Sequence, residues 1–169
     1  MRYVTVLLLA CLFGVAPATA QTTAPPSLDD VVRGLEGAYG RITDLKAEFN
    51  QNAFNKSRNQ TIPASGAVYL AKGGKLREHF GVRFMNPAAP KDGDGNFVLD
   101  LAPKQPLPTL SRLILSIDPR SWEVRKAVVY DQFENTVTMR FTKMALNTGL
   151  PDSLFTFTPP KGVATVPLQ

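Results

Sequence analysis

The spacing of apolar residues changes once along the chain, from a helical to an extended pattern. Between residues 28 and 42 the apolar side chains recur at intervals of three and four, which predicts an amphipathic helix over roughly residues 28–40. Ser27 is placed to cap this helix, and Asp29 and Asp30 fall in its first turn, where the helix dipole favours negative charge. Because an apolar stripe of this kind must lie against another element, we expect a sheet beneath it.

After the helix, apolar and polar residues alternate with a period of two, as in strands with one buried face. We predict about eight short strands, at residues 45–49, 67–71, 76–84, 97–102, 113–117, 122–130, 136–143 and 155–158. Residues 52–63 are expected to be a polar, turn-rich connection, residues 92–95 a hairpin connection and residues 132–135 a hairpin turn. This spacing predicts an α+β fold, in which the N-terminal helix covers a curved antiparallel sheet or incomplete β-barrel.

The first 20 residues have the pattern of a secretory signal peptide. Arg2 supplies a positive start, an apolar stretch follows, and residues 18–20 (Ala-Thr-Ala) form a small-residue cleavage site. Cys11 lies in the apolar stretch, where it is either a lipid-attachment residue or, as we favour, an ordinary small residue. We therefore expect a signal peptide over residues 1–20 and a single domain over residues 21–169, exported and free of cysteine.

Charge narrows the classes of partner. The formal net charge is +5, and no run of five or more like charges occurs. A nucleic-acid footprint would need clustered basic residues with stacking aromatic residues, so nucleic acid is not an expected partner. Weak attraction to an anionic membrane surface stays compatible with the composition.

No constellation of residues predicts catalysis, a metal site or a cofactor. His79 is the only histidine, and no recognisable nucleophile motif accompanies it, so we interpret it as an outward residue on a strand. The acidic residues that begin at Asp92 start like a calcium loop. However, Phe97 stands where that loop needs glycine, and Pro103 where it needs a bidentate glutamate. The sequence therefore predicts a protein that is not an enzyme and binds no metal or cofactor.

A curved sheet and one helix present two apolar faces to each other, and two readings of those faces are open. The side chains can pack against one another, which is what such stripes usually mean. Alternatively, the faces fit incompletely and leave a cavity lined by Phe, Leu, Val and Met side chains. The periodicity alone indicates an exported β-rich domain and leaves lipid binding as one interpretation.

Five stretches of sequence add a resemblance. In chain order they are ITDLKAEFNQ (42–51), GAVYLAKGGKLR (66–77), FVLDLAPK (97–104), VYDQFENTVTMRF (129–141) and FTFTPPKGV (155–163). Together they resemble the outer-membrane lipoprotein carrier proteins of the LolA family, and the last stretch is the most specific. The resemblance covers most of the chain after residue 20.

This resemblance implies a periplasmic carrier in which an open β-barrel with a helical lid holds the acyl chains of lipoproteins. Such a carrier takes its cargo from an inner-membrane ABC lipoprotein-releasing complex and passes it to an outer-membrane receptor lipoprotein. It also implies that a basic residue after the second strand helps the lid to open and close, a place that Lys72 occupies here. The residues expected to contact acyl chains are Phe49, Leu70, Phe80, Val82, Phe84, Leu99, Leu113, Leu115, Val137, Met139, Phe141 and Phe157.

The chain departs from the family pattern after residue 77. Family members continue with a Trp-x-Tyr stretch, further strands and more of the lid, whereas here a later part of the pattern follows directly. We expect a smaller sheet, a more exposed pocket and unpaired strand edges, which favour self-association. Two alternatives therefore stay open: a LolB-like outer-membrane lipoprotein receptor anchored through Cys11, and a shortened structural remnant without cargo.

Overall fold

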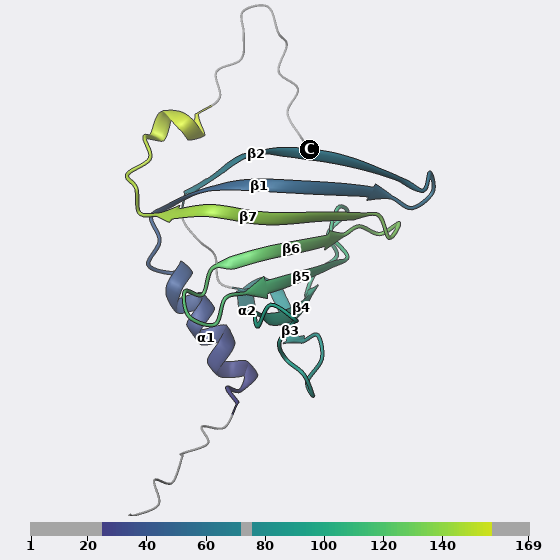
Figure 1. Cartoon of the computed structure of the whole chain (residues 1–169), viewed down its shortest axis with the longest axis horizontal. Coiled ribbons are helices and arrows are strands. Elements are labelled where there is room, and N and C mark those ends of the chain that lie inside the picture. Colours follow the sequence, from purple (N-terminus) through teal and green to yellow (C-terminus); the bar gives the residue numbers. More distant parts are fainter. Residues whose placement is uncertain (1–24, 72–75, 157–169) are drawn as a thin grey trace, which may run out of the picture.

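The computed structural model describes residues 25–71 and 76–156, where one main helix precedes a single seven-stranded antiparallel sheet. The helix is α1 (Leu28–Tyr39). The strands are β1 (Asp44–Asn55), β2 (Gln60–Ala71), β3 (Phe80–Phe84), β4 (Phe97–Pro103), β5 (Arg112–Ile117), β6 (Val124–Tyr130) and β7 (Thr136–Leu146). They lie in the order β2-β1-β7-β6-β5-β4-β3, so the curved sheet is open and β2 and β3 are its edges (Figure 1). The predicted fold class, an incomplete barrel with an N-terminal helix, is confirmed.

The start of α1 is fixed by a reciprocal cap. The Ser27 hydroxyl oxygen accepts a hydrogen bond from the backbone N–H of Asp30 at 3.2 Å, and the Asp30 carboxylate accepts from the backbone N–H of Ser27 at 3.1 Å. Farther along, Gly34 lies against the indole ring of Trp122, where an added Cβ would approach within 2.4 Å of a ring atom. The close contact between the helix and the β5–β6 connection therefore requires glycine.

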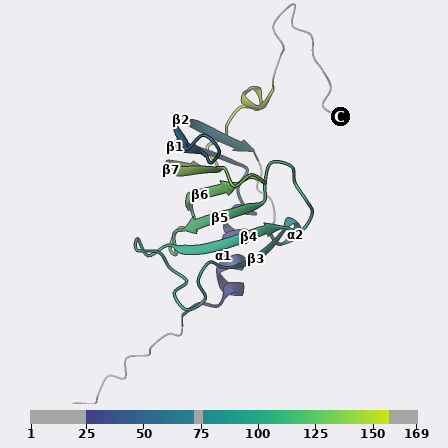
Figure 2. The same cartoon turned by 90° about the vertical axis from the view of Figure 1, so that its right-hand side faces the viewer.

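The helix covers only part of the sheet. Val31, Val32 and Leu35 of α1 are buried against Leu99 of β4 and Ile117 of β5, and these residues form the main core. In both views α1 lies at the level of β4 and β5 and away from β2 (Figures 1 and 2). We call the face of the sheet that α1 contacts the inner face, and the opposite one the outer face.

The other side of the sheet is built on a long hairpin. β1 and β2 pair without interruption from Asp44–Ala71 to Asn55–Gln60, and β7 pairs with the other edge of β1. The β1–β7 register shifts between Lys46 and Glu48. A small second core of Ile42, Leu45 and Ala47 lies at this end of the sheet.

Several predicted boundaries are wrong. The polar stretch 52–63 is mostly strand, because β1 continues to Asn55 and β2 begins at Gln60. Residues 76–84 do not form one strand: Leu76–His79 form the short helix α2 and only Phe80–Phe84 form β3. At the C-terminal end, Asp152–Phe155 form the 3₁₀ helix η1 rather than the start of a strand. Alternation and turn residues alone do not separate a short helix from a strand.

Other predicted features either hold or fall outside the described residues. Residues 92–95 lie in the connection between β3 and β4, where Gly95 has a positive φ of 82°, and residues 132–135 form the β6–β7 turn. The predicted signal peptide (1–20), the expected lid residue Lys72 and the expected acyl-chain contact Phe157 lie outside the described residues.

Candidate functional site

An apolar cavity of about 360 Å³ lies on the inner face, beside the part of the sheet that α1 covers. Its walls come from α1 and five strands, and its lining residues are Tyr39, Leu45, Phe49, Val68, Leu70, Leu113, Leu115, Val124, Ala127, Val129, Met139, Phe141 and Met144. None of these side chains carries a charge, and the Tyr39 hydroxyl is the single polar side-chain group among them. The arrangement suits a ligand that presents hydrocarbon and no polar group to the wall.

Strand alternation brings the lining residues together. Phe49 of β1 stands opposite Phe141 of β7 on one side and Gly66 of β2 on the other. A Cβ on Gly66 would lie 3.2 Å from the Phe49 ring, so the missing side chain lets this ring lie across β2. The aromatic wall of the cavity therefore depends on a glycine in the edge strand.

The one hydroxyl in the wall is already engaged. The Tyr39 oxygen accepts a hydrogen bond from the backbone N–H of Val124 at 3.1 Å, and the hydroxyl lies 4.0 Å from the sulfur of Met144. Burial raises the pKa of Tyr39 and outweighs the opposite effect of the Val124 N–H, so the phenol is neutral at pH 7. The cavity thus offers no ionised group to a bound molecule.

The cavity is closed at its floor and open at its rim. Leu45, Leu115 and Ala127 are buried, whereas Leu70 in the edge strand β2 is 51% exposed. Phe49 and Phe141 are half-buried, so their exposure lies between that of the floor residues and that of Leu70. Leu70 of the edge strand therefore forms the solvent-exposed side of the cavity.

The structure brings together half of the predicted acyl-chain contacts. Those in the cavity wall are Phe49, Leu70, Leu113, Leu115, Met139 and Phe141. Those in or against the core beneath α1, outside the wall, are Phe80, Val82, Phe84 and Leu99. Val137 lies on β7 two residues before Met139, on the same face, but it is not part of the wall. Contact with an acyl chain stays a prediction for all of them.

Sequence reasoning missed the remaining lining residues, which are Tyr39, Leu45, Val68, Val124, Ala127, Val129 and Met144. The alternation already contained a signal for Leu45 and Val68, since each shares the parity of its inward-facing neighbours. Met144 breaks that parity, because Lys143 adopts a positive φ of 48° and shifts the strand. That irregularity has no signature in the alternation.

The described residues contain neither a metal-binding cluster nor a membrane-spanning helix. Within residues 25–71 and 76–156, no group of three or more metal-binding side chains occurs. In the same residues no helix combines the length and the apolar character needed to cross a bilayer. His79 is exposed on α2.

Two comparisons find similarity to outer-membrane lipoprotein carrier proteins. The family described as outer membrane lipoprotein carrier protein LolA matches residues 84–158. The outer-membrane lipoprotein carrier protein of Dechloromonas aromatica is 24% identical to this chain over 213 aligned positions, which cover 98% of each protein. That alignment is longer than the 169 residues of this chain, so the relative contains positions that this chain lacks.

Solved structures show weaker similarity. A DUF1329 family protein from Desulfovibrio piger has a TM-score of 0.44 at 8% identity, with 75% of this chain and 95% of that chain covered. A domain from Vibrio parahaemolyticus, described as an outer membrane lipoprotein-sorting protein domain, has a TM-score of 0.41 at 9% identity, with 74% and 94% covered.

Proposed function

We propose that this chain is a periplasmic chaperone of the LolA type, which binds the acyl chains of lipoproteins and carries them from the inner to the outer membrane. The similarity of residues 84–158 to the LolA family and of the chain to a lipoprotein carrier protein supports this proposal. The observation that supports this role is the cavity on the inner face, which has thirteen uncharged lining residues and an open rim at Leu70. Residues 21–169 would form one carrier domain. No bond in the cargo is made or broken, so the role is not catalytic.

The volume of the cavity is large enough for part of one acyl chain. A methylene group takes roughly the space of a water molecule in the liquid, about 30 Å³. A cavity of about 360 Å³ therefore holds about a dozen methylene groups. At about 0.8 kcal/mol for each group removed from water, the gain is of the order of 10 kcal/mol. That is enough to hold one chain, and an open rim keeps the binding reversible.

The expected partners follow from the family. The carrier would receive acylated lipoproteins from the inner-membrane ABC lipoprotein-releasing complex and deliver them to an outer-membrane receptor lipoprotein. A LolB-like receptor would instead keep a lipid on Cys11. The mass of the N-terminus of the cellular protein separates these roles, because a chain that begins at Gln21 supports the carrier and a lipidated Cys11 supports the receptor.

A charge placed in the wall tests the cavity directly. We expect Phe141→Glu to abolish binding of a fluorescent fatty acid and of a synthetic acylated lipopeptide, because the carboxylate would be buried without a partner. Thr142→Glu is the matched control, since the next residue of β7 is exposed and points away from the cavity. Thermal unfolding of both variants shows whether either loses its fold.

Two results would contradict the carrier role. One is unchanged lipopeptide binding by folded Phe141→Glu protein. The other is wild-type protein that is isolated from the periplasm without acylated peptide and that also fails to release lipoproteins from spheroplasts. The second result would favour a structural remnant.

A further inference from the structure

The outer face of the sheet gathers basic residues that are scattered in the sequence. Strand alternation and the pairing registers place five of them there: Lys46, Arg83, Arg112, Lys126 and Arg140. A sixth, Lys143, lies at the irregularity of β7 and reaches the same face through its ion pair with Glu48. On the same face the strands carry three acidic residues, Asp44, Glu48 and Asp100. A face with twice as many basic as acidic residues attracts anions.

The three acidic residues are already engaged. Asp100 is 3% exposed and accepts from Arg83 at 2.6 Å and from Arg112 at 2.8 Å. Glu48 pairs with Lys143 at 3.0 Å.

Asp44, in turn, accepts from the hydroxyl and the backbone N–H of Thr148, each at 2.8 Å. All three acidic residues that the strands carry on this face are therefore engaged by groups other than Lys46, Lys126 and Arg140.

Two of these three cations face each other, whereas the ammonium of the third, Lys46, lies 5.7 Å from the centre of the Tyr69 ring. Lys126 of β6 and Arg140 of β7 are direct cross-strand partners, and like charges in that position destabilise a sheet. Ser116 of β5 is the partner of Lys126 on its other side, and its buried hydroxyl has no hydrogen-bond partner among the described residues. An anion above this row would relieve the repulsion.

An apolar tip lies at the end of the sheet where β6 turns into β7. Phe133, in the β6–β7 turn, is 78% exposed. The turn holds it in place, because the Asp131 carboxylate accepts from the backbone N–H groups of Phe133 at 2.8 Å and of Asn135 at 2.9 Å. The side chain of Gln132 donates to the carbonyl of Leu107 at 3.3 Å, and Leu107 is 42% exposed. Two exposed apolar side chains thus stand on neighbouring connections.

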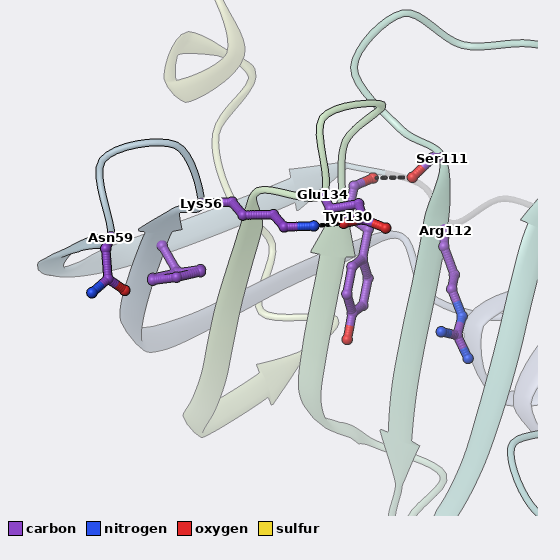
Figure 3. A pocket seen from close by; sticks show the side chains of 7 residues that line it. Lys56, Asn59, Ser111, Arg112, Tyr130 and Glu134 are labelled. Carbon is purple, nitrogen blue, oxygen red and sulfur yellow. Dashed lines mark hydrogen bonds and ion pairs between the residues drawn. The ribbon is translucent and has the colours of Figure 1, made fainter.

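Basic and aromatic side chains adjoin this tip. Arg112 lies with its guanidinium carbon 5.6 Å from the centre of the Tyr130 ring. Both line an open depression of about 690 Å³ at this end of the sheet, which Lys56, paired with Glu134, also lines (Figure 3). Aromatic and basic side chains beside an exposed apolar tip are typical of surfaces that lie at a membrane–water interface.

From this arrangement we propose that the outer face and the Phe133 turn bind the surface of bilayers that contain anionic phospholipids. The basic residues complement the lipid phosphates. The exposed Phe133 side chain adds an apolar contact that a bilayer can accept and a soluble anion cannot. The cavity opens on the inner face, so membrane binding leaves it accessible. The proposal does not depend on the carrier function, because it concerns the opposite face and needs no cargo.

Sedimentation with vesicles tests this surface. We expect the purified protein to bind vesicles of equal amounts of phosphatidylcholine and phosphatidylglycerol, to bind pure phosphatidylcholine vesicles much less, and to be released by salt. Each basic residue near an anionic surface contributes about fivefold, so Lys126→Gln combined with Arg140→Gln should weaken binding about 25-fold. Arg41→Gln combined with Arg120→Gln removes the same charge from residues outside the strands, and should have a smaller effect.

A third variant separates a bilayer from a soluble phosphate. Phe133→Ser should weaken vesicle binding several-fold at both low and high salt, because its contribution is apolar. Absence of binding to the anionic vesicles at low salt would overturn the proposal and leave an acidic protein as the partner that fits these charges. Equal losses in the two double variants, or full competition by glycerol phosphate, would also overturn it.

Discussion

The inner face of the sheet has two halves that are built from the same alternation of apolar residues, yet only one of them is filled. Under α1, Leu99 and Leu101 of β4 have no exposed surface. Across β1 and β7, Phe49 and Phe141 occupy equivalent inward positions, but they are half-buried and border a cavity. We call these regions the packed half (β3–β5 beneath α1) and the open half (β1, β2 and β7).

The difference between the halves follows from the size of the helix. Seven strands spaced by about 4.8 Å extend about 29 Å across the sheet, whereas a helix with its side chains is only about 10–12 Å wide. One helix of 12 residues therefore covers some strands and leaves the others without a partner. An inward apolar residue becomes core or binding surface according to whether the helix reaches it.

The largest expected difference between the halves is in stability. Leu99→Ala should lower the free energy of unfolding by about 2–5 kcal/mol, because it leaves a cavity in a filled core. Leu70→Ala makes the same truncation at a residue that is 51% exposed, and should cost about 1 kcal/mol or less. Urea unfolding measures both.

Binding should show the reverse order, since Leu70 is in the cavity wall and Leu99 is not. The fluorescent fatty acid should bind more weakly to Leu70→Ala than to any Leu99→Ala protein that remains folded. Equal losses of stability in the two variants would mean that the open half is as well packed as the other.

A pair of glycines in α1 tests how firmly the helix holds the packed half. Gly34→Ala would place a Cβ 2.4 Å from the Trp122 ring, and should destabilise the fold by about 1–3 kcal/mol through overpacking. Gly37→Ala is the matched control. Its Cβ would meet only the Arg41 guanidinium at 3.9 Å, so the better helix propensity of alanine should stabilise by about 0.5–1 kcal/mol.

Thermal unfolding followed by circular dichroism distinguishes the two signs. A stabilising Gly34→Ala would show that the helix moves away from Trp122 without loss of stability. The position of α1 on the sheet would then not be fixed by this contact.

The sequence predicts the face on which each strand residue lies better than what covers that face. Alternation placed Phe49, Met139 and Phe141 inward together, and the structure puts all three in the cavity wall. The same alternation placed Phe80, Val82 and Leu99 inward with equal force, although Leu99 belongs to the core beneath α1, Phe80 and Val82 pack against that core, and none of the three lines the cavity. The reason is that periodicity is a local property of one strand, whereas the reach of α1 depends on the strand order and the helix position.

Two other errors have local causes. The hairpin of β1 and β2 was predicted too short, because its tip is rich in polar residues that pair as well as apolar ones in an exposed strand. Met144 was missed because the positive φ of Lys143 shifts the inward positions by one residue.

The smallest expected effect concerns one carboxylate in each half. Hydrogen bonds from Arg112 and then Arg83 outweigh burial and lower the pKa of Asp100, which lies on β4 of the packed half. At the start of β1, in the open half, hydrogen bonds from Thr148 and Gly149 lower the pKa of Asp44. A carboxyl whose pKa is lower in the folded state contributes stability above its unfolded pKa of about 3.9, and this is lost as the pH falls through the folded value.

Salt should separate the two carboxylates. We expect the free energy of unfolding to fall as the pH is lowered from about 5 to 3, and to fall less steeply in both Asp100→Asn and Asp44→Asn. The Asp100 partners are charged and Arg83 is largely exposed, so added salt should weaken the contribution of Asp100. The Asp44 partners are neutral, so its contribution should persist. Urea unfolding across this pH range, at low and high salt, measures the difference. If salt reduced both contributions equally, charge rather than hydrogen bonding would stabilise the start of β1, and the two halves would not differ in this respect.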